Sequence, residues 1–193
     1  TFSAFLFHLY PLLLERGLEV ASVVAAMTVI GPAQVAGRIG IWMLARHTSV
    51  RAIGAVTVLG FPVAFTALAV LPPSFVVVAG AAALYGAANG IMTIVRGLAV
   101  PEMLTPEAYG AINGALTAPS TLAKAVAPAG AALIWAWAGS YDAVLVAIVV
   151  GSLVMVVSFW LAALLSPRDA FPATAADRRS RKAGRGAGRR RPR

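Results

Sequence analysis

The chain has 193 residues, of which 60% are hydrophobic and 12% are charged. A soluble domain has about 45–50% apolar and about 25% charged residues, so this composition excludes an ordinary soluble fold and indicates a chain solvated by lipid. The net charge of +9 lies almost entirely after Pro167, which excludes a basic nucleic-acid-binding face on the body of the chain. With no cysteine there is no disulfide framework, thiol nucleophile or thiolate metal site.

Apolar runs of membrane-spanning length recur along the chain. A helix rises about 1.5 Å per residue and the hydrocarbon core is about 30 Å thick, so about 20 residues cross it. The first run, at about 1–14, is too short, and we interpret it as the exit end of a helix that begins upstream, since it lacks the basic leader and cleavage site of a signal peptide. Five longer runs follow, at about 20–45, 52–71, 75–100, 110–138 and 143–165. We therefore expect an all-α, polytopic transmembrane helix bundle of six spans, the first truncated, within residues 1–166.

Prolines predict where these helices break or end. Proline lacks the amide donor and disfavours helical geometry in the residue before it. We expect a break at Gly31–Pro32 in the second span, an end of the third at Pro72 and an end of the fourth at Pro101. Pro119 and Pro128 are expected to kink the fifth, which a bilayer tolerates where neighbouring groups satisfy the freed carbonyls.

Basic residues beside the spans predict the orientation. Arg46, Arg51 and the tail at 167–193 fall on one side of the membrane, whereas Arg16 is the only basic residue in the opposite loops. By the positive-inside rule, the side with the tail is cytoplasmic. We expect the tail to be disordered. Its role is either to fix the topology alone or to bind anionic lipid as well, at about 1 kcal/mol per basic residue near the surface. It has no aromatic residue after Phe171 to stack on bases, so we expect no specific nucleic-acid partner.

Polar side chains are shared unequally among the spans. They are costly in hydrocarbon unless they face protein or water, so their distribution predicts which helices line an interior. The third and sixth spans carry only small hydroxyls that can bond to their own helix, and we interpret these two as peripheral. We expect the other four to line a water-filled cavity, with these candidates: His8, Gln34, Tyr85, Asn89, Thr93, Asn113, Thr117, Ser120 or Thr121, and Lys124.

Lys124 is the strongest single candidate, because it lies near the middle of the fifth span, where an ammonium group is costly. It predicts a substrate contact or the partner of an acid outside this sequence; snorkelling or a structural ion pair are the alternatives. Asn89 and Asn113 fit interhelical hydrogen bonds equally well, and His8 fits a structural role. Candidates for a cytoplasmic charge gate lie near helix ends, where the positive-inside rule alone also explains the cations: Arg38, Arg46, Arg96, Glu102 and Glu107.

Glycines four residues apart, Gly86 with Gly90 and Gly110 with Gly114, predict close approach of helices rather than phosphate binding. The chain has two histidines in unrelated places and neither an H-E-x-x-H nor a G-x-S-x-G signature. We therefore expect no metal, no cofactor and no enzymatic activity.

Two segments carry a family resemblance: HLYPLLLERGLEVASVVAAMTVIGPAQVAGR at 8–38 and NGIMTIVRGLAVPEMLTPEAYGAINGALTAP at 89–119. Over residues 1–166 the chain resembles the C-terminal six helices of bacterial members of the major facilitator superfamily. The resemblance implies helices seven to twelve of a twelve-helix transporter, with an N-terminal half as the missing partner. In that fold helices seven, eight, ten and eleven line the cavity or the domain interface and helices nine and twelve are peripheral, which is the division that the polar residues give.

The resemblance departs at one loop. Where the superfamily often has G-x-x-x-D-R-x-G-R-R, this chain has GRIGIWMLARHTSVR at 37–51, without the aspartate. A gate based on that acid is therefore in doubt, and Glu102 or Glu107 would have to pair with Arg46 or Arg38.

Our leading hypothesis is secondary active transport of a small solute by alternating access, in a bacterial inner membrane, with a proton or another ion as the coupling partner. No carboxylate lies within a span, so a buried coupling acid would belong to the other half. The alternative is a permease subunit of a multi-component (ABC-type) transporter. That alternative needs a cytoplasmic coupling helix, for which the loop at 101–109 is short.

Overall fold

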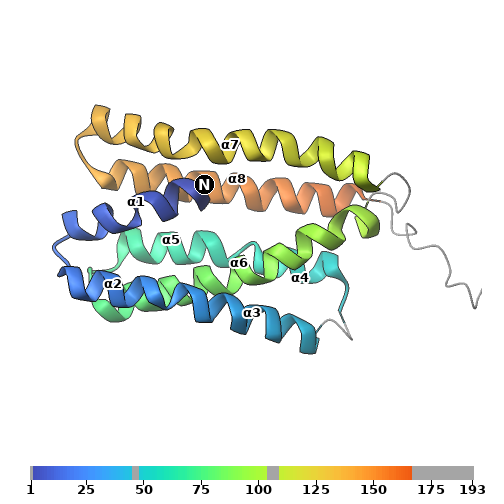
Figure 1. Ribbon diagram of the computed structural model, residues 1–193, viewed down its shortest axis with the longest axis horizontal. Coiled ribbons are helices and arrows are strands. Elements are labelled where there is room, and N and C mark those ends of the chain that lie inside the picture. Colours follow the sequence, from blue (N-terminus) through green and yellow to red (C-terminus); the bar gives the residue numbers. More distant parts are fainter. Residues whose placement is uncertain (1, 45–47, 104–108, 167–193) are drawn as a thin grey trace, which may run out of the picture.

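The computed structural model describes residues 2–44, 48–103 and 109–166, and all regular secondary structure within those ranges is α-helical (Figure 1). The helices are α1 (Phe2–Glu15), α2 (Val20–Thr28), α3 (Ile30–Leu44), α4 (Val50–Thr57), α5 (Gly60–Val70), α6 (Phe75–Met103), α7 (Tyr109–Ala138) and α8 (Tyr141–Leu165).

Five helical segments are long and apolar enough to cross a membrane, as expected of a multi-pass membrane protein: Val20–Met43, Val50–Val70, Phe75–Leu98, Gly110–Ala138 and Tyr141–Leu165. The second and third predicted spans thus each comprise two helices, α2 with α3 and α4 with α5. The apolar helix α1 is shorter than a full span, so the first of the six predicted spans stays a prediction.

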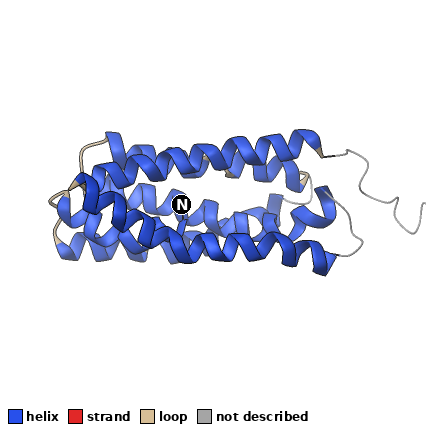
Figure 2. Ribbon diagram, turned by 90° about the horizontal axis from the view of Figure 1, so that it is seen from above, coloured by secondary structure: helices blue, strands red, loops and turns tan. Residues whose placement is uncertain are grey.

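The helices run side by side along one long axis, and their connections alternate between its two ends (Figures 1 and 2). The turns at 16–19, 71–74 and 139–140 lie at one end, on the left of Figure 1. The helix ends that flank residues 45–49 and 104–108 lie at the other. This is the alternation that the sequence predicts for successive membrane crossings.

Helix α6 is at the centre of the packing. It contacts α2, α3, α4 and α5, whereas α8 packs on α4, α5 and α7, and α1 fills the space against α7 and α8. The largest buried side chains come from α1, α5 and α6: Phe5, Phe61, Phe65 and Tyr85. Together with the partly buried Phe2 they form an aromatic cluster whose contacting ring centroids lie 4.3 to 6.1 Å apart.

Helices α3 and α6 touch through their backbones. A Cβ atom placed on Gly86 would lie 2.6 Å from the carbonyl oxygen of Ile30, and one placed on Gly90 would overlap the carbonyl oxygen of Gln34. Gly37 of α3 meets the backbone of α6 in the same way. The predicted packing role of the first glycine pair is therefore confirmed, because only hydrogen at these positions allows this approach.

Two of the apolar spans are interrupted near their middle. Helix α2 ends at Thr28 and α4 at Thr57, with C-cap residues Val29 and Val58. Four residues after Thr28 and Val58 stand Pro32 and Pro62, which cannot donate to those carbonyls. The first break, at Val29, lies just before the break predicted at Gly31–Pro32, whereas the sequence indicates no break within the span at 52–71.

Other prolines lie within continuous helices. Helix α7 runs through Pro119 and Pro128. Helix α6 continues past Pro101 to Met103, so the prediction that it ends at that proline is wrong. A proline in the last turn of a helix removes only one donor near an end that already lacks partners, which the helix tolerates. The basic tail at 167–193 lies outside the described residues.

Burial follows side-chain size more than polarity. In an 18-residue apolar stretch of the span of α4 and α5, 44% of the residues are buried, whereas in such a stretch of α7 only 6% are. The third span, predicted to be peripheral, is thus well packed, because its phenylalanines fill the core, whereas α7 is rich in alanine and glycine. In α8, Ser152 and Ser158 donate to the carbonyl oxygens of Val149 and Val154, at 2.6 and 2.7 Å, which confirms that small hydroxyls bond to their own helix.

Candidate functional site

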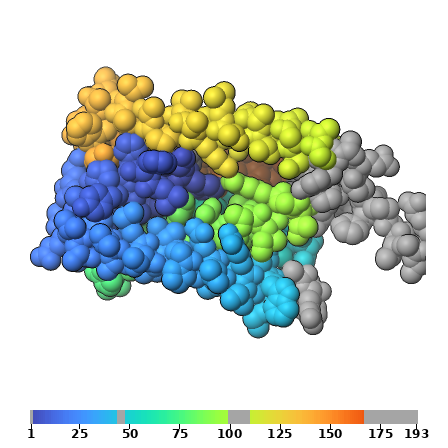
Figure 3. All heavy atoms as spheres, in the orientation of Figure 1, coloured from blue at the N-terminus to red at the C-terminus, as the bar shows by residue number. Residues whose placement is uncertain are grey.

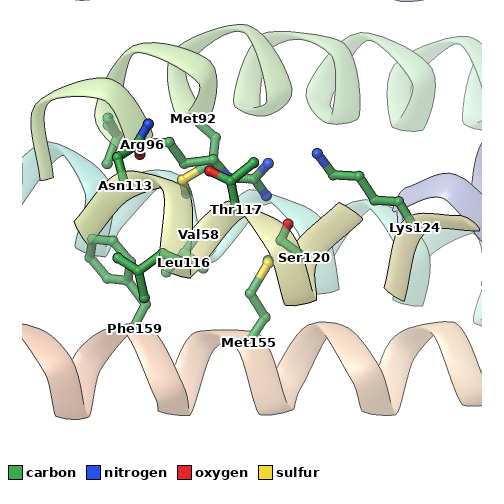
Figure 4. A pocket seen from close by; sticks show the side chains of 11 residues that line it. Val58, Met92, Arg96, Asn113, Leu116, Thr117, Ser120, Lys124, Met155 and Phe159 are labelled. Atoms are coloured by element: carbon green, nitrogen blue, oxygen red, sulfur yellow. The ribbon is translucent and has the colours of Figure 1, made fainter. Parts of the chain in front are cut away.

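A cavity of about 370 Å³ lies between α6, α7 and α8. Figure 3 shows the surface hollowed between α7 and α6, with part of α8 visible at the floor. Figure 4 shows the side chains that line it. The polar lining is Arg96, Asn113, Thr117, Ser120 and Lys124, and the apolar lining is Val58, Met92, Val95, Leu116, Met155 and Phe159.

Four of the five polar residues come from one face of α7. Asn113, Thr117, Ser120 and Lys124 are spaced four, three and four residues apart, which keeps them on one side of a helix. The sequence left Ser120 and Thr121 as alternatives for the third position. In the structure Ser120 lines the cavity, whereas Thr121, about 100° further round the helix, is exposed outside it.

Two cations share this cavity. The ammonium group of Lys124 extends along it toward the part lined by Arg96 and Thr117 (Figure 4). Arg96 lies near the end of its span, but its long side chain returns toward the membrane interior, and its guanidinium carbon is 5.5 Å from the ring centroid of Phe2. Such a cation–π contact stabilises the guanidinium without neutralising it.

No carboxylate balances these charges among the described side chains. The acids with described side chains are Glu15, Glu19 and Asp142, and all three lie in or beside the turns at one end of the bundle, outside the cavity lining. Within that part of the chain neither Arg96 nor Lys124 has a hydrogen bond or ion pair with a protein group. Among the described side chains, the cavity wall therefore carries two formal positive charges without a carboxylate partner, with amide and hydroxyl groups beside them.

The remaining candidates on α3 and α6 lie elsewhere. Tyr85 is fully buried in the aromatic cluster, and its hydroxyl has no partner within the described ranges. Thr93 donates to the carbonyl oxygen of Gly90 at 2.6 Å. Asn89 and Gln34 are half-buried and line none of the described pockets, and Gln34 presents its backbone to α6.

His8 links α1 to the last two helices. Its Nε2 lies 3.0 Å from the carbonyl oxygen of Pro128, and its Nδ1 lies 3.3 Å from the hydroxyl of Tyr141. A carbonyl only accepts, so Nε2 carries the proton and Nδ1 accepts from Tyr141. These two hydrogen bonds favour the structural role that the sequence left open for His8.

Most residues of the predicted charge gate lie outside the part of the chain that the structure describes. Arg38 is exposed on α3. Arg46 and Glu107 lie outside the described residues, as does the side chain of Glu102, whose backbone belongs to α6. The gate therefore stays a prediction.

A polar cluster that the sequence missed joins three turns at the opposite end from residues 45–49. Arg16 donates to Asp142 Oδ1 at 2.5 Å and to the carbonyl oxygen of Leu68. The neighbouring Glu15 accepts from Trp135 Nε1 at 3.2 Å and from the backbone amide of Tyr141 at 2.8 Å. The sequence could have indicated this cluster, because Arg16 and Asp142 fall in loops that are predicted to lie on the same side of the membrane.

Comparison with known proteins adds no relative, because no family model, curated protein or solved structure matches the chain. The described residues also contain no group of three histidine, aspartate or glutamate side chains placed to hold a metal ion.

Proposed function

We propose that the chain is the C-terminal half of a secondary active transporter of the major facilitator type, and that the cavity between α6, α7 and α8 is its part of a substrate site. The carrying observation is the convergence of Arg96 with Asn113, Thr117 and Lys124 on one cavity. Charged and amide groups at membrane depth are costly unless they face water, protein or a ligand.

The exposure of α7 supports a second helical half. Nearly all described side chains of α7 are at least partly exposed, and they include Asn113 and Lys124, which line the cavity from one face of the helix. A lipid-facing helix has no use for such a face. In alternating access the substrate site lies between two halves that rock against each other, so each half on its own presents polar groups on an open surface.

The proposal extends to topology. The five apolar segments, with α1 as the end of the first span, would place the C-terminal ends of α3, α6 and α8 together on the cytoplasmic side of a bacterial inner membrane, with the basic tail adjacent to them. Fused after residue 166, a reporter enzyme that works only in the cytoplasm is expected to be active, and one that works only outside the cytoplasm is expected to be inactive. Activity of the second reporter contradicts the orientation.

The function is tested in cells that lack the intact gene and receive it back in altered forms. A panel of labelled solutes and growth inhibitors identifies the compounds whose uptake or export depends on the gene. We expect Lys124→Gln to lower that transport at least tenfold, because it removes a charge in the cavity. Lys124→Arg is the matched control, since it keeps the positive charge at the same position, and it should retain transport.

Energy dependence separates the proposal from an ATP-driven permease. Transport by a secondary carrier stops when an ionophore collapses the ion gradient and continues when ATP alone is depleted. The opposite response, or full transport by Lys124→Gln, would contradict the proposal.

A further inference from the structure

We propose that the cavity binds an organic anion with an apolar body, holding its acidic head between Arg96 and Lys124. This substrate class rests on the proposed function. It deepens that function by assigning a chemical role to each side of the cavity.

The positive charge of the cavity favours a negatively charged ligand. Arg96 and Lys124 line the same space, and no carboxylate whose side chain is described lines it with them. Two like charges that line one cavity repel each other, and an anion bound between them removes that repulsion. A cation is disfavoured by both groups, and a neutral ligand leaves the repulsion in place.

The polar neighbours set the geometry of the head. Thr117 and Ser120 stand on the face of α7 between Asn113 and Lys124 (Figure 4). Hydroxyl and amide groups can donate to the oxygens of a carboxylate, sulfonate or phosphate, and a guanidinium can bind two such oxygens at once. These donors point to an oxyanion head rather than to a halide ion.

The apolar wall of the cavity indicates that the rest of the ligand is apolar. Met92, Met155 and Phe159 line the cavity beside Leu116. Methionine side chains adapt to irregular apolar shapes and contact aromatic rings favourably. The volume of about 370 Å³ is near the lower end of the usual range for small-molecule sites, about 300–1,000 Å³. A bare inorganic anion would leave most of this wall without a partner.

The first experiment compares three probes on purified full-length protein in nanodiscs of zwitterionic lipid. 2-Naphthoate has both features, 2-naphthamide keeps the ring without the charge, and acetate keeps the charge without the ring. We expect naphthoate alone to raise the melting temperature, with a dissociation constant at least tenfold lower than for either of the others. Equal binding of naphthoate and naphthamide overturns the anion assignment, even if the transport phenotype of Lys124→Gln stands.

Variants locate the binding. Lys124→Gln and Arg96→Gln are each expected to weaken naphthoate binding at least tenfold, while Lys124→Arg and Arg38→Gln bind normally. A tenfold change corresponds to about 1.4 kcal/mol. Size-exclusion profiles and the melting temperature of the free protein show whether each variant is folded. Unchanged naphthoate binding in a folded Lys124→Gln protein overturns the site.

An anionic phospholipid has the same chemistry, so its contribution is measured separately. The naphthoate titration is repeated in nanodiscs that contain phosphatidylglycerol. Unchanged affinity assigns the cavity to a solute. Loss of affinity that is relieved by dilution of the anionic lipid assigns the cavity to lipid and overturns the solute proposal.

Discussion

Helix α6 meets α3 and α7 in opposite ways. Toward α3 its glycines lie against backbone atoms, so no atom can be added at Gly90 without separating the helices. Toward α7 the side chains of the two helices enclose a cavity, and Gly110 and Gly114 of α7 have no atom within 4 Å of an added Cβ. Both helices carry glycines four residues apart. Glycines four residues apart therefore predict that a helix can approach another helix closely. Whether it does so depends on the helix that packs against the glycines.

The comparison also separates a rigid side from an adaptable one. Interiors packed backbone to backbone resist change, because any added volume moves whole helices. A side lined by methionines and long cations can accommodate differences by rotation about side-chain bonds. We therefore expect substitutions on the α3 side of α6 to act on folding and those on the α7 side to act on binding.

The largest effect is expected from Gly90→Ala. The added methyl group overlaps the backbone of Gln34, and overpacking of this kind costs about 1–3 kcal/mol. The matched control is Gly114→Ala, which meets no atom and should stabilise α7 by up to about 1 kcal/mol through helix propensity. Thermal unfolding of the two purified variants measures the difference. Equal melting temperatures would contradict the close contact of α3 with α6.

A carboxylate placed inside the cavity gives the next largest effect. Thr117→Asp provides an internal anion for Arg96 and Lys124, so it should raise the melting temperature of the free protein and lower naphthoate binding at least tenfold. Thr121→Asp, outside the cavity on the same helix, should do neither. If Thr117→Asp binds naphthoate as well as the unaltered protein, the two cations do not share a ligand.

Removal of the His8 bonds is expected to loosen α7 more mildly. His8→Phe keeps an aromatic ring but loses the contacts to Pro128 and Tyr141, and each such hydrogen bond contributes about 0.5–1.5 kcal/mol. Hydrogen exchange should increase near Pro128 and stay unchanged in α3. Tyr10→Phe, on the exposed side of α1, is the control and should leave both regions unchanged. Faster exchange in α3 instead would show that His8 does not act through α7.

The smallest effect is expected at the ion pair of Arg16 with Asp142. The side chain of Asp142 is 71% exposed, and exposed pairs typically contribute about 0.2–1 kcal/mol and weaken in salt. A double-mutant cycle with Arg16→Gln and Asp142→Asn measures the coupling at low and high ionic strength. A coupling well above 1 kcal/mol that is insensitive to salt would show that the pair is desolvated.

Hydropathy located the apolar helices to within a few residues, since lipid solvation acts on every residue of a span. The break before Pro32 was predictable because glycine precedes it. The break before Pro62 was missed because that proline lies in an uninterrupted apolar run, where no polar residue marks the interruption.

The cavity was predictable only in part. Helical spacing placed Asn113, Thr117 and Lys124 on one face of α7. The sequence could not place the head of Arg96, because a long side chain reaches several ångströms from a Cα position near the helix end. The sequence also could not predict that Met155 and Phe159 line the cavity. Most of their neighbours in the sequence are apolar, and only the packing of the helices distinguishes a cavity wall from a lipid-facing surface.

The bonds that Glu15 accepts also set the order in which the bundle is completed. Its partners Trp135 and Tyr141 follow it by 120 and 126 residues, which takes roughly ten seconds at synthesis rates of about 5–20 residues per second. Until the hairpin of α7 and α8 enters the membrane, α1 can pack on α5 and α6 through its aromatic side chains, but it lacks α7 and α8 and the two donors that this carboxylate has in the complete bundle. A variant that delays that hairpin would therefore lower the amount of protein that survives cellular quality control, while the molecules that do mature would be as stable as the original.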